Sequence, residues 1–175
     1  MLGIDPGLRL TGYAVLEIPR GGGAGAGGGS RRGRAGGGAG AEATLVEAGV
    51  IRLVQGRSVA RRLVELDADL RDIIERTAPH VGAVEKLYAH YKHPLTGVIM
   101  GHARGVVLLN IQRAGMDVVE LGATEVKKSL TGNGHASKAQ MQSAVQAQLG
   151  MAAPPSPPDI ADAIAIALCC LRRLG

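Results

Sequence analysis

The stretch LGIDPGLRLTGYAV, residues 2–15, decides the fold of this chain. A short apolar segment ends at Asp5, a Pro-Gly turn follows, and a second apolar segment runs over residues 11–18, which predicts a β-hairpin. Asp5 therefore lies at the end of an apolar strand, where a charge is unfavourable unless something binds it. Other acids at the ends of apolar elements would indicate a shared site.

Beyond this hairpin, strands come first and helices then alternate with strands. Residues 43–54 predict a third strand, and apolar positions spaced from Val59 to Ile74 predict an amphipathic helix over residues 58–80. The remaining patterns predict strands over residues 81–88 and 116–122 and helices over residues 95–115, 123–132, 138–150 and 158–174. This order predicts an α/β fold with a mixed five-stranded sheet flanked by helices.

The chain of 175 residues, 46% of them hydrophobic, predicts a single domain over residues 1–175. Residues 21–41 are rich in Gly and Arg and have no hydrophobic periodicity, so we expect a flexible insert between two neighbouring antiparallel strands. Its Arg31, Arg32 and Arg34 would suit contacts with DNA phosphates, but a tolerated low-complexity expansion is the favoured interpretation.

The formal net charge of +5 favours a polyanionic partner only weakly, because part of the charge lies in the insert.

Cys169 and Cys170 are neighbours on a predicted helix and cannot readily bond to each other, so we expect reduced core thiols in a cytoplasmic protein. No apolar run reaches about 18 residues without a charge or a break, and the first residues lack a signal-peptide pattern. We expect neither secretion nor a membrane partner.

Four acids mark the ends of apolar elements: Asp5, Glu85, Asp159 and Asp162. Each of the three aspartates has an ordinary alternative, since Asp159 and Asp162 fit the first turn of a helix and Asp5 fits a turn that bonds its own backbone. An ordinary structural role explains Glu85 less well, because Glu is disfavoured in a buried strand.

Brought together in one domain, these four carboxylates would repel each other and gain affinity for protons unless cations neutralised them. Mg²⁺ and Mn²⁺ prefer carboxylate oxygens. Two such ions about 3.5 to 4 Å apart would hold both the attacking water and the leaving oxygen of a phosphodiester. The sequence therefore predicts a carboxylate cluster for divalent metal.

The chain resembles the RuvC family of bacterial Holliday-junction endonucleases, in the RNase H-like superfamily. The matching motifs are LGIDPGLRLTGYAV, AVEKLY, GHARGVVL, TEVKKSLTGNGHASKAQMQ and DIADAIAIAL, which together span nearly the whole chain outside the insert. The resemblance implies an RNase H-like fold and two Mg²⁺ or Mn²⁺ ions per active site, with Asp5, Glu85, Asp159 and Asp162 as catalytic metal ligands. It also implies a homodimer that cuts two strands of a four-way junction symmetrically, leaving 5′-phosphate and 3′-hydroxyl ends.

Three further positions carry over from the family as DNA contacts. Tyr88 matches an aromatic residue that enters the junction, and Lys127 and Lys138 match basic residues near the scissile phosphate. A half-buried structural Tyr and solvated surface lysines are the alternatives. Residues 89–103 depart from the family pattern. The resemblance also implies a branch-migration motor as partner.

Gly97, Gly101 and Gly105 form a stripe at a four-residue period on one predicted helix. Either this helix packs closely on its own sheet, or the stripe lies in a homodimer interface.

Two other functions compete with the nuclease: a junction-binding module without cleavage, and a fragment of an actin-like phosphate-binding ATPase, against which the short length counts strongly.

Overall fold

The computed structural model describes residues 1–18, 43–87 and 94–175. The predicted insert at 21–41 and Tyr88 lie outside the described residues. The elements are β1 (Leu2–Asp5), β2 (Leu10–Glu17), β3 (Thr44–Arg52), α1 (Val59–Thr77), β4 (Val81–Glu85), α2 (Pro94–Arg113), β5 (Asp117–Leu121), α3 (Ala123–Thr131), α4 (Lys138–Gln148) and α5 (Pro158–Leu174). Each predicted strand and helix is present, with ends that differ by a few residues.

The sheet has five strands in the order β3-β2-β1-β4-β5, which confirms the mixed sheet. The first three strands pair antiparallel, whereas β4 pairs parallel with β1 and β5 pairs parallel with β4. Asp5 is opposite Gly12 across the hairpin, and Ile4 is opposite Val84 on β4. The carboxyl ends of β1, β4 and β5 therefore meet at one end of the sheet.

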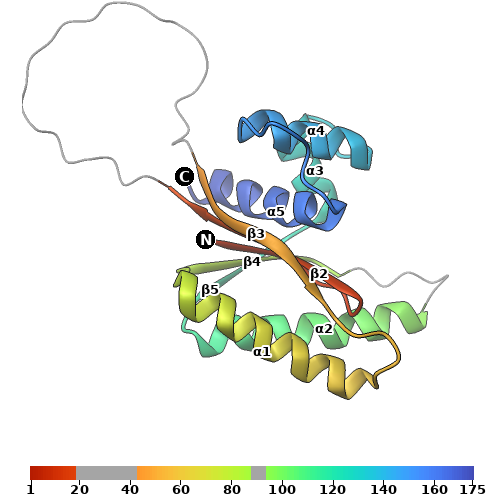
Figure 1. Ribbon diagram of the computed structural model, residues 1–175. Helices are drawn as coiled ribbons and strands as arrows, with labels where there is room; N and C mark the ends of the chain where they lie inside the picture. The colour runs from red at the N-terminus through yellow and green to blue at the C-terminus, as the bar shows by residue number, and fades with distance from the viewer. Residues whose placement is uncertain (19–42, 88–93) are drawn as a thin grey trace, which may run out of the picture.

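Helices cover both faces of the sheet: α3, α4 and α5 lie on one face, and α1 and α2 lie on the other (Figure 1). Because side chains alternate along a strand, Leu2, Ile4 and Val84 pack against α1 and α2. Gly3 and Ala83 face α5 instead. Asp5, two residues beyond Gly3, faces the same side as α5.

Helix α5 lies very close to the sheet because β1 and β2 present glycines beneath it. A carbon added at Gly3 would lie 2.5 Å from the backbone oxygen of Ala163, and one added at Gly12 would lie 2.2 Å from the backbone oxygen of Asp159. Both separations are far below van der Waals contact. Cys169 and Cys170 are buried and free in this helix, as expected.

The glycine stripe of α2 faces away from the sheet. A side chain at Gly97, Gly101 or Gly105 would meet nothing within 4 Å among the described residues. The interpretation of the stripe as close packing on the sheet is therefore wrong. The neighbouring Leu95 and Val98 are 77% and 57% exposed, so α2 presents an apolar strip to the surface.

No helix in the described ranges combines the length and the apolar character needed to cross a membrane.

Candidate active site

Asp5 and Glu85 are the last residues of two neighbouring parallel strands. Since Ile4 pairs with Val84, the next residue on each strand is an acid, and the two acids lie side by side. Ala83 packs in the core beneath α5, so alternation places Glu85, like Asp5, on the α5 face. The register of β1 and β4 thus brings together two acids that are eighty residues apart in the sequence.

Asp159 and Asp162, in the first two turns of α5, lie over the same end of the sheet. The backbone of Asp159 lies directly over Gly12, and Gly12 is the partner of Asp5 across the hairpin. Asp162 follows one helical turn later and stays half-buried. The close approach of α5 therefore places its first two turns beside Asp5.

The electrostatics agree with this arrangement. Burial raises the pKa of Asp5 to about 7, and the charges of Glu85, Asp162 and Asp159 add to the rise. Burial and Asp162 raise the pKa of Glu85, and burial and Asp159 raise the pKa of Asp162. The four carboxylates are therefore near enough to repel one another.

The structure tests the ordinary alternatives for the three aspartates. The N-cap of α5 is Pro157, with no side-chain cap hydrogen bond, so neither Asp159 nor Asp162 caps this helix. Asp159 does lie in the first turn of α5, where a negative charge also stabilises the helix. In the turn after Asp5, Thr11 rather than Asp5 supplies the local bonds: its hydroxyl donates to the Gly7 carbonyl at 2.6 Å and accepts from the Gly7 N–H at 3.2 Å.

The donor chemistry of the four acids fits a hard divalent cation, because all of them offer carboxylate oxygens. Among residues 1–18, 43–87 and 94–175, no three His, Cys, Asp or Glu side chains converge closely enough to hold a metal ion as they stand. The four acids nonetheless share one end of the sheet, where the charges of Glu85, Asp162 and Asp159 all act on Asp5.

Two arginines that the sequence analysis did not single out fix the strands that carry Asp5 and Glu85. Arg62, at the start of α1, donates to the Leu8 carbonyl at 2.9 Å and holds the turn after Asp5. Arg104, on α2, donates to the backbone carbonyl of Glu85 at 3.3 Å and pairs with Glu120. Arg104 lies within the motif GHARGVVL, which was the available signal, whereas nothing in the sequence linked Arg62 to the turn.

Lys127 and Lys138 lie beside the acids. The charge of Lys127 offsets part of the rise in the pKa of Glu85 and Asp162, and the charge of Lys138 offsets part of the rise for Asp5 and Asp162, which places each lysine near its acids. The two lysines come from α3 and from the first residue of α4. The structure therefore brings six of the seven predicted site residues to one end of the sheet.

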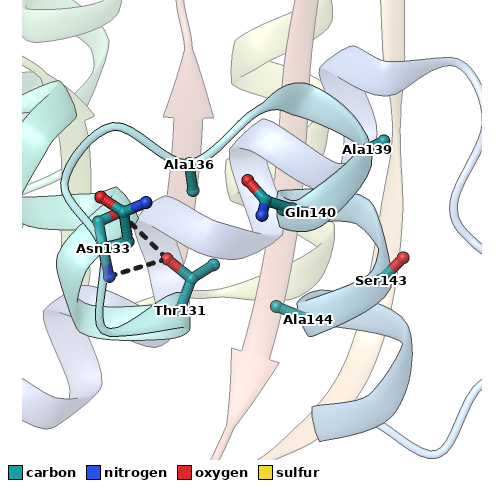
Figure 2. Close-up of a pocket in the computed structure, with 7 residues that line it drawn as sticks. All are labelled: Thr131, Asn133, Ala136, Ala139, Gln140, Ser143 and Ala144. Atoms are coloured by element: carbon teal, nitrogen blue, oxygen red, sulfur yellow. Dashed lines mark hydrogen bonds between the residues drawn. The ribbon is translucent and has the colours of Figure 1, made fainter.

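A hollow of about 410 Å³ lies between the end of α3 and the face of α4 (Figure 2). It is lined by Thr131, Asn133, Ala136, Ala139, Gln140, Ser143 and Ala144, none of which is an acid. Thr131 donates to the carbonyls of Lys127 and Asn133 and so closes the turn after α3. The hollow is therefore distinct from the acid cluster, and its wall supports the segment that carries the two lysines.

Comparison with known proteins gives one family. A family model described as crossover junction endodeoxyribonuclease RuvC matches residues 35–170. A protein of Rhodopirellula baltica with the same description is 41% identical over 171 residues, which are 97% of this chain and 84% of that relative.

Solved structures lead to the same family. The structure of Thermus thermophilus RuvC superposes with a TM-score of 0.78 at 30% identity and covers 100% of this chain and 97% of that chain. T. thermophilus RuvC in complex with a Holliday junction substrate gives 0.79 at 29% identity, over 96% of this chain and 90% of that chain. The RNase H-like fold expected from the sequence is confirmed by these matches. This chain belongs to the RuvC family of crossover junction endodeoxyribonucleases.

Proposed function

We propose that this chain is a metal-dependent endonuclease that resolves four-way DNA junctions in recombination and repair by two symmetric cuts. The observation that carries the proposal is the meeting of Asp5, Glu85, Asp159 and Asp162 at one end of the sheet. Membership of the family supports the same activity, and a T. thermophilus relative has been solved with a Holliday junction.

The four acids would hold the metal, with Asp5 and Glu85 supplied by the strands and Asp159 and Asp162 by α5. Two bound Mg²⁺ or Mn²⁺ ions would lower the pKa of the attacking water and neutralise charge on the leaving oxygen. The acids must be ionised to bind a cation, so metal ions compete with protons for these carboxylates. The raised pKa of Asp5 makes this competition strongest at that residue. The carboxylates therefore set both the position and the pH range of the reaction.

Lys127 and Lys138 would bind the phosphate groups of the strand being cut. Each stands beside the acids, where a fixed cation stabilises the negative charge that develops on the phosphate. Tyr88 follows Glu85 by three residues, and we propose that its ring stacks on a base at the junction. Hydrolysis would leave 5′-phosphate and 3′-hydroxyl ends.

The enzyme would act as a homodimer, because symmetric cuts on two strands need two active sites. The exposed strip of α2 is the surface we assign to this contact, since it combines the three glycines with Leu95, Val98 and Leu109. Glycine lets two helix backbones approach closely, and exposed apolar side chains favour burial in an interface. A branch-migration motor in the cytoplasm is the further partner that we propose.

Gly101→Leu should weaken the dimer at least about tenfold and leave the monomer folded. The added side chain meets open space in the monomer and raises helix propensity by about 1 kcal/mol, but it would obstruct the partner helix. Sedimentation equilibrium measures the dissociation constant. Val64→Leu, at an exposed position on α1, is the control. An unchanged dissociation constant would remove α2 from the interface.

The central test is cleavage of a labelled synthetic four-way junction beside a linear duplex of matched sequence, in EDTA, Mg²⁺ or Mn²⁺. We expect paired cuts in the junction with either metal and none in EDTA. Tight junction binding without cuts in any metal would indicate a binding module. Equal cleavage of junction and duplex would contradict structure selectivity.

A further inference from the structure

Two exposed arginines at the active end of the sheet have no acidic partner within the described ranges. Most arginines elsewhere are neutralised: Arg71, Arg76, Arg104, Arg113 and Arg173 each form an ion pair with Asp or Glu. Arg9 and Arg52, in contrast, form neither an ion pair nor a side-chain hydrogen bond in the part of the chain that the structure describes. Their charge is available to an outside anion.

The backbone brings these two arginines together. Arg52 ends β3 opposite Leu10, and the carbonyl of Arg9 accepts from the N–H of Leu53 at 3.2 Å. Arg9 belongs to the turn that follows Asp5, so both arginines lie at the sheet end that holds the acids. They flank the acids on the β3 side, whereas Lys127 and Lys138 come from α3 and α4.

Strand alternation indicates the direction of the Arg52 side chain. Ile51 and Leu53 pack in the core beneath α1 and α2, so Arg52 projects to the opposite face, where α5 lies. The first turn of α5 covers Gly12, two residues along β2 from the partner of Arg52. Arg52 therefore shares its face with Asp159 and the other acids.

The nearby carboxylate of Glu65 does not neutralise this pair. Glu65 is held by Arg57 in an ion pair, and it also accepts from the N–H of Val54 at 3.4 Å. The charge of Arg61 acts on the same carboxylate. Glu65 thus already has Arg57 and Arg61 beside it.

We infer that Arg9 and Arg52 bind the phosphate backbone of the DNA strand at a second contact, on the β3 side of the cut. This inference rests on the proposed function and extends it to residues outside the acid and lysine site. Arg52 lies two strands and two residues away from Asp5, which at a strand spacing of about 4.8 Å and a rise of about 3.4 Å separates their backbones by about 12 Å. For a duplex whose axis runs from the acids toward β3, with about 3.4 Å per nucleotide of one strand, this separation puts the contact about three to four nucleotides from the cut.

The experiment measures the salt dependence of junction binding without divalent metal, so that binding is separate from cleavage. Each phosphate contact contributes about 0.9 to the slope of log affinity against log salt. Arg9→Gln with Arg52→Gln should lower the slope by about two and weaken binding by about tenfold or more at 0.1 M salt. Single variants should each remove about half of the slope change.

Arg113→Gln is the matched control. Arg113 is 60% exposed and is the last residue of α2, at the other end of the sheet, before β5 begins. Arg113→Gln should leave unchanged both the affinity for the junction and the slope of log affinity against log salt. Thermal melting of the Arg9 and Arg52 variants should match that of the parent protein, since neither arginine makes a side-chain hydrogen bond or ion pair that the structure describes.

A neutral methylphosphonate linkage gives a second, independent test. Placed three or four nucleotides from the cut on one side, it should weaken binding of the parent protein but not of Arg52→Gln, because the two changes remove the same contact. Additive losses at every position would overturn the inference. If the parent protein cleaves junctions and the arginine variants bind them as tightly as the parent does, only this contact is overturned. If the parent neither binds nor cuts junctions, the proposed function itself is overturned.

Discussion

Asp5→Asn is expected to reduce junction cleavage on the order of a thousandfold or more while junction binding in EDTA is retained. The amide keeps the size of the side chain but removes the charge that would hold the metal, so the electrostatic stabilisation of the reaction is lost. The basic residues around the site are untouched, and DNA affinity depends chiefly on them. Single-turnover cleavage and a metal-free binding titration measure the two effects separately. Cleavage within tenfold of the parent would contradict the assignment of Asp5 as a metal ligand.

The same variant should make the metal-free protein more stable. Folding raises the pKa of Asp5 from 3.8 to about 7, so the folded state binds more protons than the unfolded chain between these values. The free energy of unfolding must therefore fall as pH rises from about 4 to about 7. Asp5→Asn removes this loss, and at pH 8 in EDTA its free energy of unfolding should exceed that of the parent by a few kcal/mol. Urea unfolding at pH 4 and pH 8 tests the sign: the two proteins should differ at pH 8 and converge at pH 4.

The second large effect is expected for Gly12→Ala. The new methyl group would lie 2.2 Å from the backbone oxygen of Asp159, so the first turn of α5 must move away from the sheet. Overpacking of this kind destabilises a protein by about 1 to 3 kcal/mol, and a displacement of about 1 Å in a catalytic group can reduce the rate about a hundredfold. Urea unfolding and single-turnover cleavage at saturating metal measure the two consequences.

Gly3→Ala is the matched control for that result. Its methyl group meets the same helix at Ala163 and Ala167, one to two turns further from Asp159. We expect a similar loss in the free energy of unfolding and a smaller loss of cleavage. If both variants lost cleavage equally, the position of Asp159 would not be the cause.

The sequence was sufficient to predict the hairpin, the order of elements and the acids. Asp5 and Glu85 interrupt apolar strands, and such interruptions are visible without knowing what packs against them. The side chains that hold the strands were not visible. Arg62 bonds a carbonyl 54 positions away and Arg104 one 19 positions away, and contacts of that kind leave no periodic pattern.

The neighbours of the glycines were likewise not predictable from the sequence. A period of four on α2 indicates that something approaches this helix closely, but spacing alone does not identify the neighbour. The structure excludes the sheet, because the stripe points outward. For β1 and β2 the reverse holds: Gly3 and Gly12 carry no repeating pattern, yet they set the height of α5 above the sheet. Their role depends on a helix about 150 residues later, which only the fold brings near.

The connection between β2 and β3 offers a practical opportunity. Glu17 pairs with Thr44, so the ladder itself keeps the two ends of this connection on adjacent strands. Those residues lie at the end of the sheet opposite Asp5, because β2 runs away from the acids. Lengthening a loop whose ends are already held together adds only about 0.6 kcal/mol for each doubling. A fluorophore or a surface tether introduced between these strands would therefore let single molecules be watched while the opposite end of the sheet stays open to DNA.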